Sequence, residues 1–147
     1  MSKDDKSTTI EKLVSPEPPA RVVPNADRPF WDAIDSGTLV LAECACGARY
    51  ARIQACLRCG ATAEEMSWTP ASGNGAVRSF IVFDKSYHPY FAASIPYVVA
   101  TITLEEGPEI VTNVVDINPL AIRIGMAVRL VVRKRGEYSL PFASANI

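Results

Sequence analysis

Apolar and polar residues alternate along most of the second half of the chain. Several segments there place an apolar side chain at every second position, which is the period of a β-strand with one buried face. The apolar positions are rich in β-branched residues, and turn-forming residues separate the segments. A series of short strands of this kind favours a small closed barrel. The predicted strands cover residues 75–84, 97–104, 109–116, 127–134 and 138–142.

A helical pattern precedes these strands. Pro29 suits the first turn of a helix, because the N–H that proline lacks would have no partner there. Phe30 and Ile34 stand four residues apart and therefore share one face of a helix. We expect a short helix over residues 29–36, followed by a strand over residues 38–42.

Residues 1–27 show neither period. Pro16, Pro18, Pro19 and Pro24 each fix φ and remove a backbone donor, which favours extended or polyproline-like conformations. We expect this segment to be a flexible arm, and packing of the arm on a partner is the alternative.

Four cysteines form the sharpest motif in the chain. Cys44, Cys46, Cys56 and Cys59 make two close pairs, in the sequences Cys-Ala-Cys-Gly and Cys-Leu-Arg-Cys-Gly. Structural zinc sites prefer four thiolates in a tetrahedron and leave no position for a catalytic water, so we predict a structural Zn²⁺. The first pair is one residue shorter than the usual spacing, so a remnant site that no longer binds metal is one alternative. A redox-active pair is another, although no thioredoxin-like βαβ pattern surrounds it.

The overall composition restricts the function. Of the 147 residues, 48% are hydrophobic and 21% are charged, which is typical of a globular protein. The net charge of −1 disfavours general nucleic-acid binding, which needs a basic surface. No apolar run approaches the ~20 residues that span a membrane, and the N-terminus lacks the apolar core of a signal peptide. We expect a cytoplasmic protein with reduced thiols and no membrane partner.

A loop rich in aromatic residues is predicted between the first two barrel strands, over residues 84–96. Tyr87, His88, Tyr90 and Phe91 lie in it. Aromatic side chains in a long loop often contact a ligand or a partner, and local packing is the alternative. His88 is the only histidine, and the sequence places no nucleophile or acid beside it, so we predict no catalytic residue.

The order of helix, four-cysteine segment and small barrel resembles the family known as domain of unknown function 35. The resemblance covers residues 28–147 and rests on an ordered series of short motifs. These are Arg28-Pro29-Phe30-Trp31, the two cysteine pairs with the glycine after each, Gly75-Ala76-Val77, Pro96-Tyr97-Val98, Glu106-Gly107-Pro108 and Ile124-Gly125-Met126-Ala127-Val128.

The resemblance implies a mainly β fold with an N-terminal helix, a rubredoxin-like zinc ribbon and a five-stranded OB-fold barrel. The chain would then divide into four parts. These are a flexible N-terminal arm at 1–27, the helix and lead-in strand at 28–43, the zinc ribbon at 44–69 and the OB-fold at 70–147.

The resemblance also implies that catalysis belongs to a larger partner. Members of the family accompany acyl-CoA enzymes. The expected role is a bridging, accessory subunit that helps assemble a thiolase, acyltransferase or side-chain aldolase complex, in steroid or lipid degradation. The expected partner is a thiolase-like or aldolase large subunit, or a hot-dog-fold hydratase, and acyl-CoA would be a shared ligand.

Two alternatives come from other functional classes. One is an OB-fold protein that binds single-stranded nucleic acid through stacking aromatic residues in a basic groove. The other is an autonomous small enzyme that acts on acyl thioesters through His88.

A basic stripe near the end of the fourth barrel strand consists of Arg129, Arg133, Lys134 and Arg135, and we select Arg129 and Arg133 as its candidate contacts. Guanidinium groups bind phosphates through paired hydrogen bonds, so these residues are candidates for contact with the phosphates of coenzyme A. A solvent-exposed outer face of the strand is the alternative.

Overall fold

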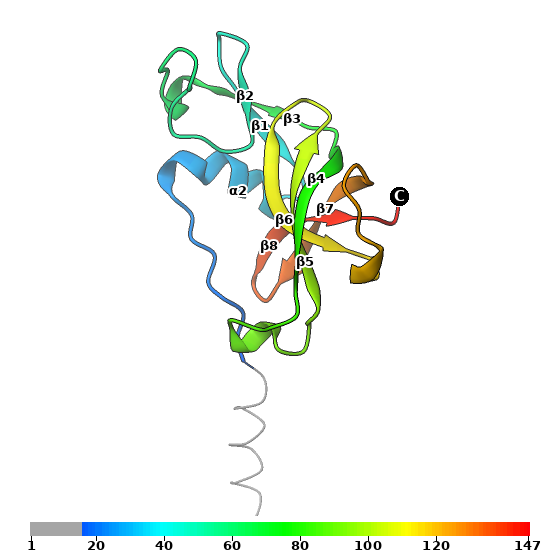
Figure 1. The fold of residues 1–147 in the computed structure, drawn as a ribbon. Coiled ribbons are helices and arrows are strands. Elements are labelled where there is room, and N and C mark those ends of the chain that lie inside the picture. Colours follow the sequence, from blue (N-terminus) through cyan, green and yellow to red (C-terminus); the bar gives the residue numbers. More distant parts are fainter. Residues whose placement is uncertain (1–15) are drawn as a thin grey trace, which may run out of the picture.

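The computed structural model describes residues 16–147, which form a mainly β structure in two adjoining parts (Figure 1). A small three-stranded sheet carries the cysteine loops, and a closed five-stranded barrel follows it in the chain. One short α-helix contacts strands of both parts. These features confirm the predicted fold class. Residues 1–15 of the predicted arm lie outside the described residues.

The helix α2 (Arg28–Asp35) continues from the 3₁₀ turn η1 (Asn25–Asp27). Phe30, Trp31 and Ile34 are buried on its inner face, as their helical spacing predicts. No helix in the described part of the chain is long and apolar enough to cross a membrane.

The small sheet has the strand order β2-β1-β3. Its middle strand, β1 (Val40–Glu43), pairs antiparallel with β2 (Arg49–Tyr50) on one side and with β3 (Ser67–Pro70) on the other. The connection from β2 to β3 contains the 3₁₀ turn η2 (Ala63–Glu65). β1 corresponds to the strand predicted directly after the helix.

The barrel consists of five strands in the order β4-β5-β6-β8-β7, and pairing of β4 with β7 closes it. All neighbouring strands are antiparallel except β6 and β8, which run parallel. Each strand overlaps one of the five predicted segments. Their bounds are β4 (Asn74–Phe83), β5 (Tyr97–Leu104), β6 (Glu109–Val115), β7 (Ala127–Arg135) and β8 (Tyr138–Ser144).

Alternation places one face of the strands in a shared core. In β5, Val98, Ala100, Ile102 and Leu104 are buried, and the residues between them are partly exposed. The same cluster of buried residues includes the inner face of α2 and Leu41 of β1. The helix therefore joins the small sheet and the barrel through one continuous apolar core.

Two connections of the barrel contain 3₁₀ turns. The turn η3 (Pro89–Phe91) lies in the loop between β4 and β5, and η4 (Pro119–Ala121) lies between β6 and β7. Figure 1 shows η3 at the end of the molecule opposite to the small sheet. The aromatic loop is therefore remote from the cysteines.

Arg21, in the described part of the predicted arm, is held against the folded body. Its guanidinium donates hydrogen bonds to both carboxylate oxygens of Asp35, at 2.8 and 2.9 Å, and to the Ser139 carbonyl oxygen at 2.9 Å. The same group lies 4.8 Å from the ring centroid of Trp31 and 5.7 Å from that of Tyr138. The arm is therefore fastened at this residue, and the flexibility of the segment as a whole stays a prediction.

Candidate functional site

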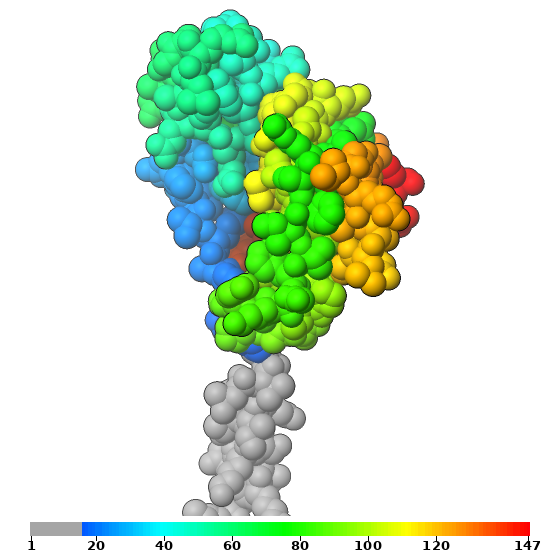
Figure 2. All heavy atoms as spheres, in the orientation of Figure 1, coloured from blue at the N-terminus to red at the C-terminus, as the bar shows by residue number. Residues whose placement is uncertain are grey.

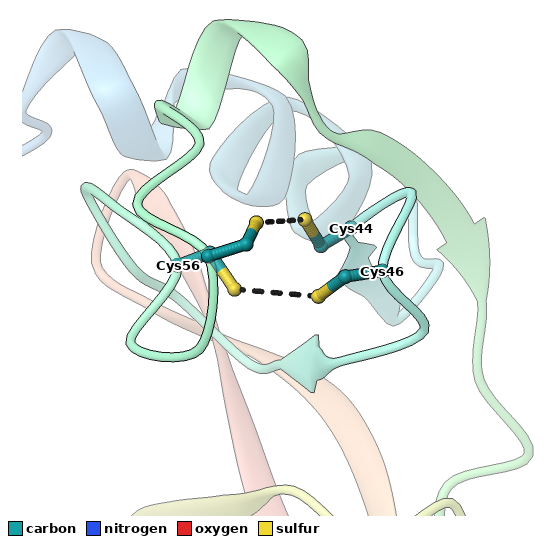
Figure 3. A group of neighbouring side chains, drawn as sticks. Cys44, Cys46 and Cys56 are labelled. Atoms are coloured by element: carbon teal, nitrogen blue, oxygen red, sulfur yellow. Dashed lines mark hydrogen bonds between the residues drawn. The ribbon is translucent and has the colours of Figure 1, made fainter.

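The four cysteine side chains meet between two neighbouring loops. Cys44 directly follows β1 and Cys46 lies in the turn after it, whereas Cys56 and Cys59 come from the connection between β2 and β3. The Sγ atoms of Cys44 and Cys59 are 3.4 Å apart, and those of Cys46 and Cys56 are 3.7 Å apart. Figure 3 shows Cys46 and Cys56 facing each other across the gap between the loops.

Both loops make a tight turn that ends at a glycine. The N–H of Gly47 donates to the Cys44 carbonyl oxygen and the N–H of Gly60 to the Cys56 carbonyl oxygen, each at 2.9 Å. The two glycines have φ of +91° and +79°, a left-handed conformation that other residues adopt only with strain. The first pair therefore forms a metal-binding type of turn although it is one residue shorter than the second.

The sulfur positions match one tetrahedral metal ion. All four Sγ atoms lie within 4.8 Å of one another. A zinc–sulfur bond of about 2.3 Å in tetrahedral geometry separates the sulfurs by about 3.8 Å. The separations of 3.4 and 3.7 Å lie close to this value and no pair is farther apart than 4.8 Å, so the four cysteines are placed to hold a metal ion. Four thiolates would fill its coordination sphere and leave no position for a reacting water.

The surroundings of the cluster shift the pKa values of Cys44 and Cys56 in opposite directions. A hydrogen bond from the Tyr50 hydroxyl group, with an oxygen–sulfur distance of 3.4 Å, lowers the pKa of the Cys56 thiol to about 6. The backbone N–H of Cys46 acts in the same direction on Cys44. There, however, the hydrogen bond with Cys59 and burial outweigh it and raise the pKa of Cys44 to about 12. A metal ion entering the cluster must therefore displace the proton of Cys44.

A cavity of about 290 Å³ lies between the η3 turn and the barrel. Three of the residues predicted as ligand or partner contacts line it, namely Tyr90, Phe91 and Arg133. The rest of the lining comes from the loop and the barrel strands and includes Ser94, Tyr97, Asn113, Val114, Lys134, Arg135 and Phe142.

The other three predicted contact residues lie outside this cavity. Tyr87 is 76% exposed on the surface of the loop. His88 caps η3, because its Nδ1 accepts a hydrogen bond of 3.1 Å from the backbone N–H of Tyr90. Arg129 lies towards the opposite end of β7, where its Nε donates to Asn74 Oδ1 at 3.3 Å. The structure thus brings together three of the six predicted contacts and not the others.

Arg133 is paired with an acid of the same chain. Its guanidinium donates to both carboxylate oxygens of Asp116, at 3.2 and 2.6 Å. The Ser144 hydroxyl group donates to the same carboxylate at 2.5 Å. Arg133 and Ser144 together lower the pKa of Asp116. The charge of Arg133 is therefore balanced at the edge of the cavity.

Arg135 also lines the cavity, although the sequence analysis placed it in the basic stripe and did not select it as a contact. Its guanidinium lies 5.1 Å from the ring centroid of Phe91, 5.4 Å from that of Phe142 and 6.0 Å from that of Tyr90. The period of two along β7 could have indicated it, because residues 133 and 135 share one face of the strand. The aromatic rings around it come from η3 and β8, which are far apart in the sequence. No local sequence pattern predicts that they meet Arg135.

Comparison with known proteins finds similar chains among acyl-CoA enzymes and scaffold proteins. A family model described as "ChsH2, C-terminal OB-fold domain" matches residues 68–133. A probable enoyl-CoA hydratase alpha subunit of Thermomonospora curvata is 36% identical over 131 residues, which are 87% of this chain and 39% of that relative. A DUF35 domain-containing scaffold protein of Methanothermobacter thermautotrophicus is 40% identical over 66 residues, which are 45% of this chain and 49% of that relative. The chain thus spans less than half the length of each of these curated relatives.

Solved structures provide two further comparisons. A chain of the Ltp2-ChsH2(DUF35) aldolase is 32% identical and superimposes with a TM-score of 0.77, covering 87% of this chain and all (100%) of the other. A DUF35 protein of unknown function from Sulfolobus solfataricus is 11% identical, with a TM-score of 0.59 and 98% of each chain covered. The second likeness is one of fold alone.

Proposed function

Because this chain belongs to the DUF35 family of OB-fold proteins, we propose that it is a non-catalytic accessory subunit of an acyl-CoA enzyme complex. One observation carries the proposal. This chain is 32% identical to a chain in the structure named Ltp2-ChsH2(DUF35) aldolase, and it covers the whole of that chain. The names of the two curated relatives, a hydratase subunit and a scaffold protein, support the same class of function. The reaction would take place on the partner.

The partner that fits best is the large subunit of an aldolase or another thiolase-like enzyme. A hot-dog-fold hydratase is the second choice, because one relative is named as an enoyl-CoA hydratase subunit. We place the complex in the cytoplasm and in lipid or steroid degradation. Acyl-CoA would be a ligand shared by both subunits.

We propose Zn²⁺ as the ion of the cysteine cluster, with Cys44, Cys46, Cys56 and Cys59 as its ligands. The separation of the four sulfurs suits zinc, and the closed thiolate set suits a structural role. The ion would supply stability to the loops, because the buried cluster beneath them consists of few and mostly small side chains.

The outer face of β4, β5 and β6 offers an apolar surface for the partner. Ile81 of β4 and Val111 of β6 are 62% and 64% exposed. Val99 of β5 stands beside Ile81 in the strand register. The exposed Tyr87 of the aromatic loop packs against Phe83 at the end of β4, with ring centroids 6.0 Å apart. Figure 2 shows β4 in green along the front of the barrel. Exposed aliphatic and aromatic side chains grouped in this way are typical of protein interfaces.

The predicted contact residues divide between the two surfaces. Tyr90, Phe91 and Arg133 would meet the shared ligand or the partner at the cavity, and Tyr87 would meet the partner on the apolar face. His88 and Arg129 would contribute by ordering η3 and the edge of β7.

The test is co-purification from the native host, followed by reconstitution. A tagged chain is expected to recover a thiolase-fold, aldolase or hydratase subunit in fixed stoichiometry. The purified pair should convert an acyl-CoA substrate that this chain alone leaves unchanged. The double variant Ile81→Asp, Val111→Asp should lose the partner. Leu120→Asp, on the exposed η4 turn, is the matched control and should retain it.

Two results would contradict the proposal. One is turnover of acyl thioesters by the isolated chain that His88→Ala abolishes. The other is binding of a single-stranded oligonucleotide that weakens steeply with salt, because counterion release is the signature of phosphate-backbone binding.

A further inference from the structure

The two cysteine loops give unequal support to their sulfurs. In both loops the glycine N–H bonds to the carbonyl oxygen of the first cysteine, so only the N–H groups before the glycine are left for a sulfur. In the second loop, the N–H groups of Arg58 and Cys59 both act on Cys56 as hydrogen-bond donors. In the first loop, the N–H of Cys46 takes this role for Cys44. The shorter loop therefore supplies one donor where the longer loop supplies two.

A metal site made of four thiolates needs such donors. Four thiolates bring more negative charge than a divalent ion balances, and hydrogen bonds to the sulfurs offset the excess. Donors around the ligands also fix the direction in which each sulfur points. A site with one short loop therefore gains from a donor that comes from another element.

Tyr50 of strand β2 supplies a donor of this kind. Its hydroxyl group lies 3.4 Å from Cys56 Sγ and accepts a hydrogen bond of 3.1 Å from the backbone N–H of Leu57. A metal-bound thiolate can only accept, so in the loaded site the hydroxyl group is the donor to Cys56. The bond from Leu57 holds the oxygen in the position from which it reaches the sulfur.

The same hydroxyl group joins the two halves of the cluster. Tyr50 pairs with Ala42 of β1, and the first cysteine pair lies in the connection between these two strands. The Tyr50 ring packs against the small buried cluster of the cysteine loops. By contrast, Leu57 in the second loop is 87% exposed, so side-chain packing does not hold it. The hydroxyl group is therefore a direct link from the hairpin of the first pair to the tip of the second loop.

We propose that Tyr50 is a positioning residue of the metal site, whose hydroxyl group holds the second loop in place and orients Cys56 towards the ion. It acts through Cys56 and does not bind the metal, because the four thiolates already fill the coordination sphere. This role rests on the zinc ion proposed above and is independent of the accessory role of the chain.

The test compares Tyr50→Phe with the wild type, because phenylalanine keeps the ring and removes only the hydroxyl group. Competition with a chromophoric chelator measures the Zn²⁺ affinity of each full-length chain. Loss of a hydrogen bond to a metal ligand typically weakens metal binding by about 10- to 100-fold, so we expect a weakening of at least about tenfold.

Tyr138→Phe is the matched control. The Tyr138 hydroxyl group, on β8 of the barrel, donates to the Pro19 carbonyl oxygen. This variant also loses one hydroxyl group and one hydrogen bond, but none at the cysteine cluster, so its Zn²⁺ affinity should equal that of the wild type.

Replacement of Zn²⁺ by Co²⁺ gives a readout that a general loss of stability would not move. The sulfur-to-cobalt charge-transfer absorption reports the electron density on the thiolates. A hydrogen bond lowers the energy of the sulfur electrons, so its loss in Tyr50→Phe should shift this absorption to longer wavelength. The wild type and Tyr138→Phe should share one spectrum.

Hydrogen exchange tests the link without any variant. In the Zn²⁺-loaded wild type, the Leu57 amide hydrogen should exchange slowly although its side chain is exposed, because the Tyr50 oxygen accepts it. Fast exchange at Leu57 would contradict the link, even if Tyr50→Phe failed to fold.

Three results with the variants would overturn the inference. These are an unchanged Zn²⁺ affinity in Tyr50→Phe, an equal loss of affinity in Tyr138→Phe, and a cobalt spectrum that Tyr50→Phe leaves unshifted. A wild-type chain that holds no metal would overturn it together with the zinc site. None of these results affects the accessory role, because that role is tested by recovery of the partner.

Discussion

Gly75 marks a close approach of two backbones within the barrel. A Cβ atom at this position would lie 2.7 Å from Ile102 Cγ2 and 2.8 Å from the Thr103 carbonyl oxygen. Because the second of these is a backbone atom, β5 would have to move away from β4. We expect Gly75→Ala to lower the free energy of unfolding by about 1–3 kcal/mol, as overpacking typically does. Urea denaturation measures it, and an unchanged midpoint would mean that β4 and β5 are not in such close contact.

Asp116 gives the stability of the protein a dependence on acid pH. Arg133 and Ser144 lower the pKa of Asp116 in the folded state, so the unfolded chain takes up a proton at a higher pH than the folded one. The resulting stabilisation is complete above the ordinary aspartate pKa of about 3.9 and is lost as the pH falls below it towards the folded-state value. Asp116→Asn keeps a residue type that tolerates the φ of +60° at this position.

The expected result for Asp116→Asn is lower stability than the wild type at neutral pH and a smaller difference at pH 3 and below. Denaturation midpoints at a series of pH values measure both quantities. A difference that stays constant across the series would show that the ion pair does not contribute through its charge.

At the scale of elements, Arg21 fastens an extended segment to α2 and β8. It makes three hydrogen bonds and contacts two rings. Arg28 is the matched control, because its side chain bonds only Asn25 in an exposed pair. We expect Arg21→Ala to cost about 1–2 kcal/mol of unfolding free energy and Arg28→Ala close to nothing. Limited proteolysis should also cleave the segment before Arg21 faster in the first variant, and equal behaviour of the two variants would contradict the fastening.

The cysteine loops should depend on metal more than the barrel does. Their buried cluster is separate from the main core and contains Ala42, Cys44, Ala48, Cys56 and Met66. A structural zinc ion contributes on the order of 10 kcal/mol to such a module. We expect a chelator to remove one metal ion per chain, with loss of dispersed amide signals from the loops and retention of those from the barrel. Elemental analysis identifies the ion, and ordered loops in a metal-free chain would contradict the prediction.

The local sequence pattern predicted the elements in which buried apolar residues recur at a regular spacing. β5 has strict alternation, and α2 has Phe30 and Ile34 at helical spacing, so both were predicted close to their observed bounds. β3 was not, because Ser67–Pro70 contains one large apolar residue and ends in proline. Its place is fixed by pairing with β1, which is a long-range contact that no short window contains.

The candidate sites differ in the same way. The cysteine cluster was predictable because its ligands lie close together in the sequence and their chemistry is specific. The cavity was predictable only in part, because Arg135, Phe91 and Phe142 come from three separate elements. The ion pair of Arg133 with Asp116 also required the fold, because it joins the end of β7 to the residue after β6.

At the scale of the whole molecule, the barrel is closed by two short contacts. β6 and β8 share two registered pairs, and β4 and β7 share three. Where the strands β6 and β8 diverge, the Thr112 hydroxyl group donates to the Pro141 carbonyl oxygen at 2.6 Å. We expect amide hydrogens of β6 and β8 at this contact to exchange with solvent faster than those of β5, which is paired along its length on both sides. Equal protection in all three strands would contradict this.

The parallel contact of β6 with β8 is the weakest seam of the barrel, because it contains only two registered pairs. On one side of this seam lies the sheet β4-β5-β6, and on the other lies the hairpin β7-β8. Each keeps its own strand pairing when the β6–β8 contact opens. Opening the β6–β8 contact breaks few hydrogen bonds, so separation of the sheet from the hairpin is the easiest local opening of the barrel. The cavity beside η3 is lined by residues from both the sheet and the hairpin, so its width changes when they separate.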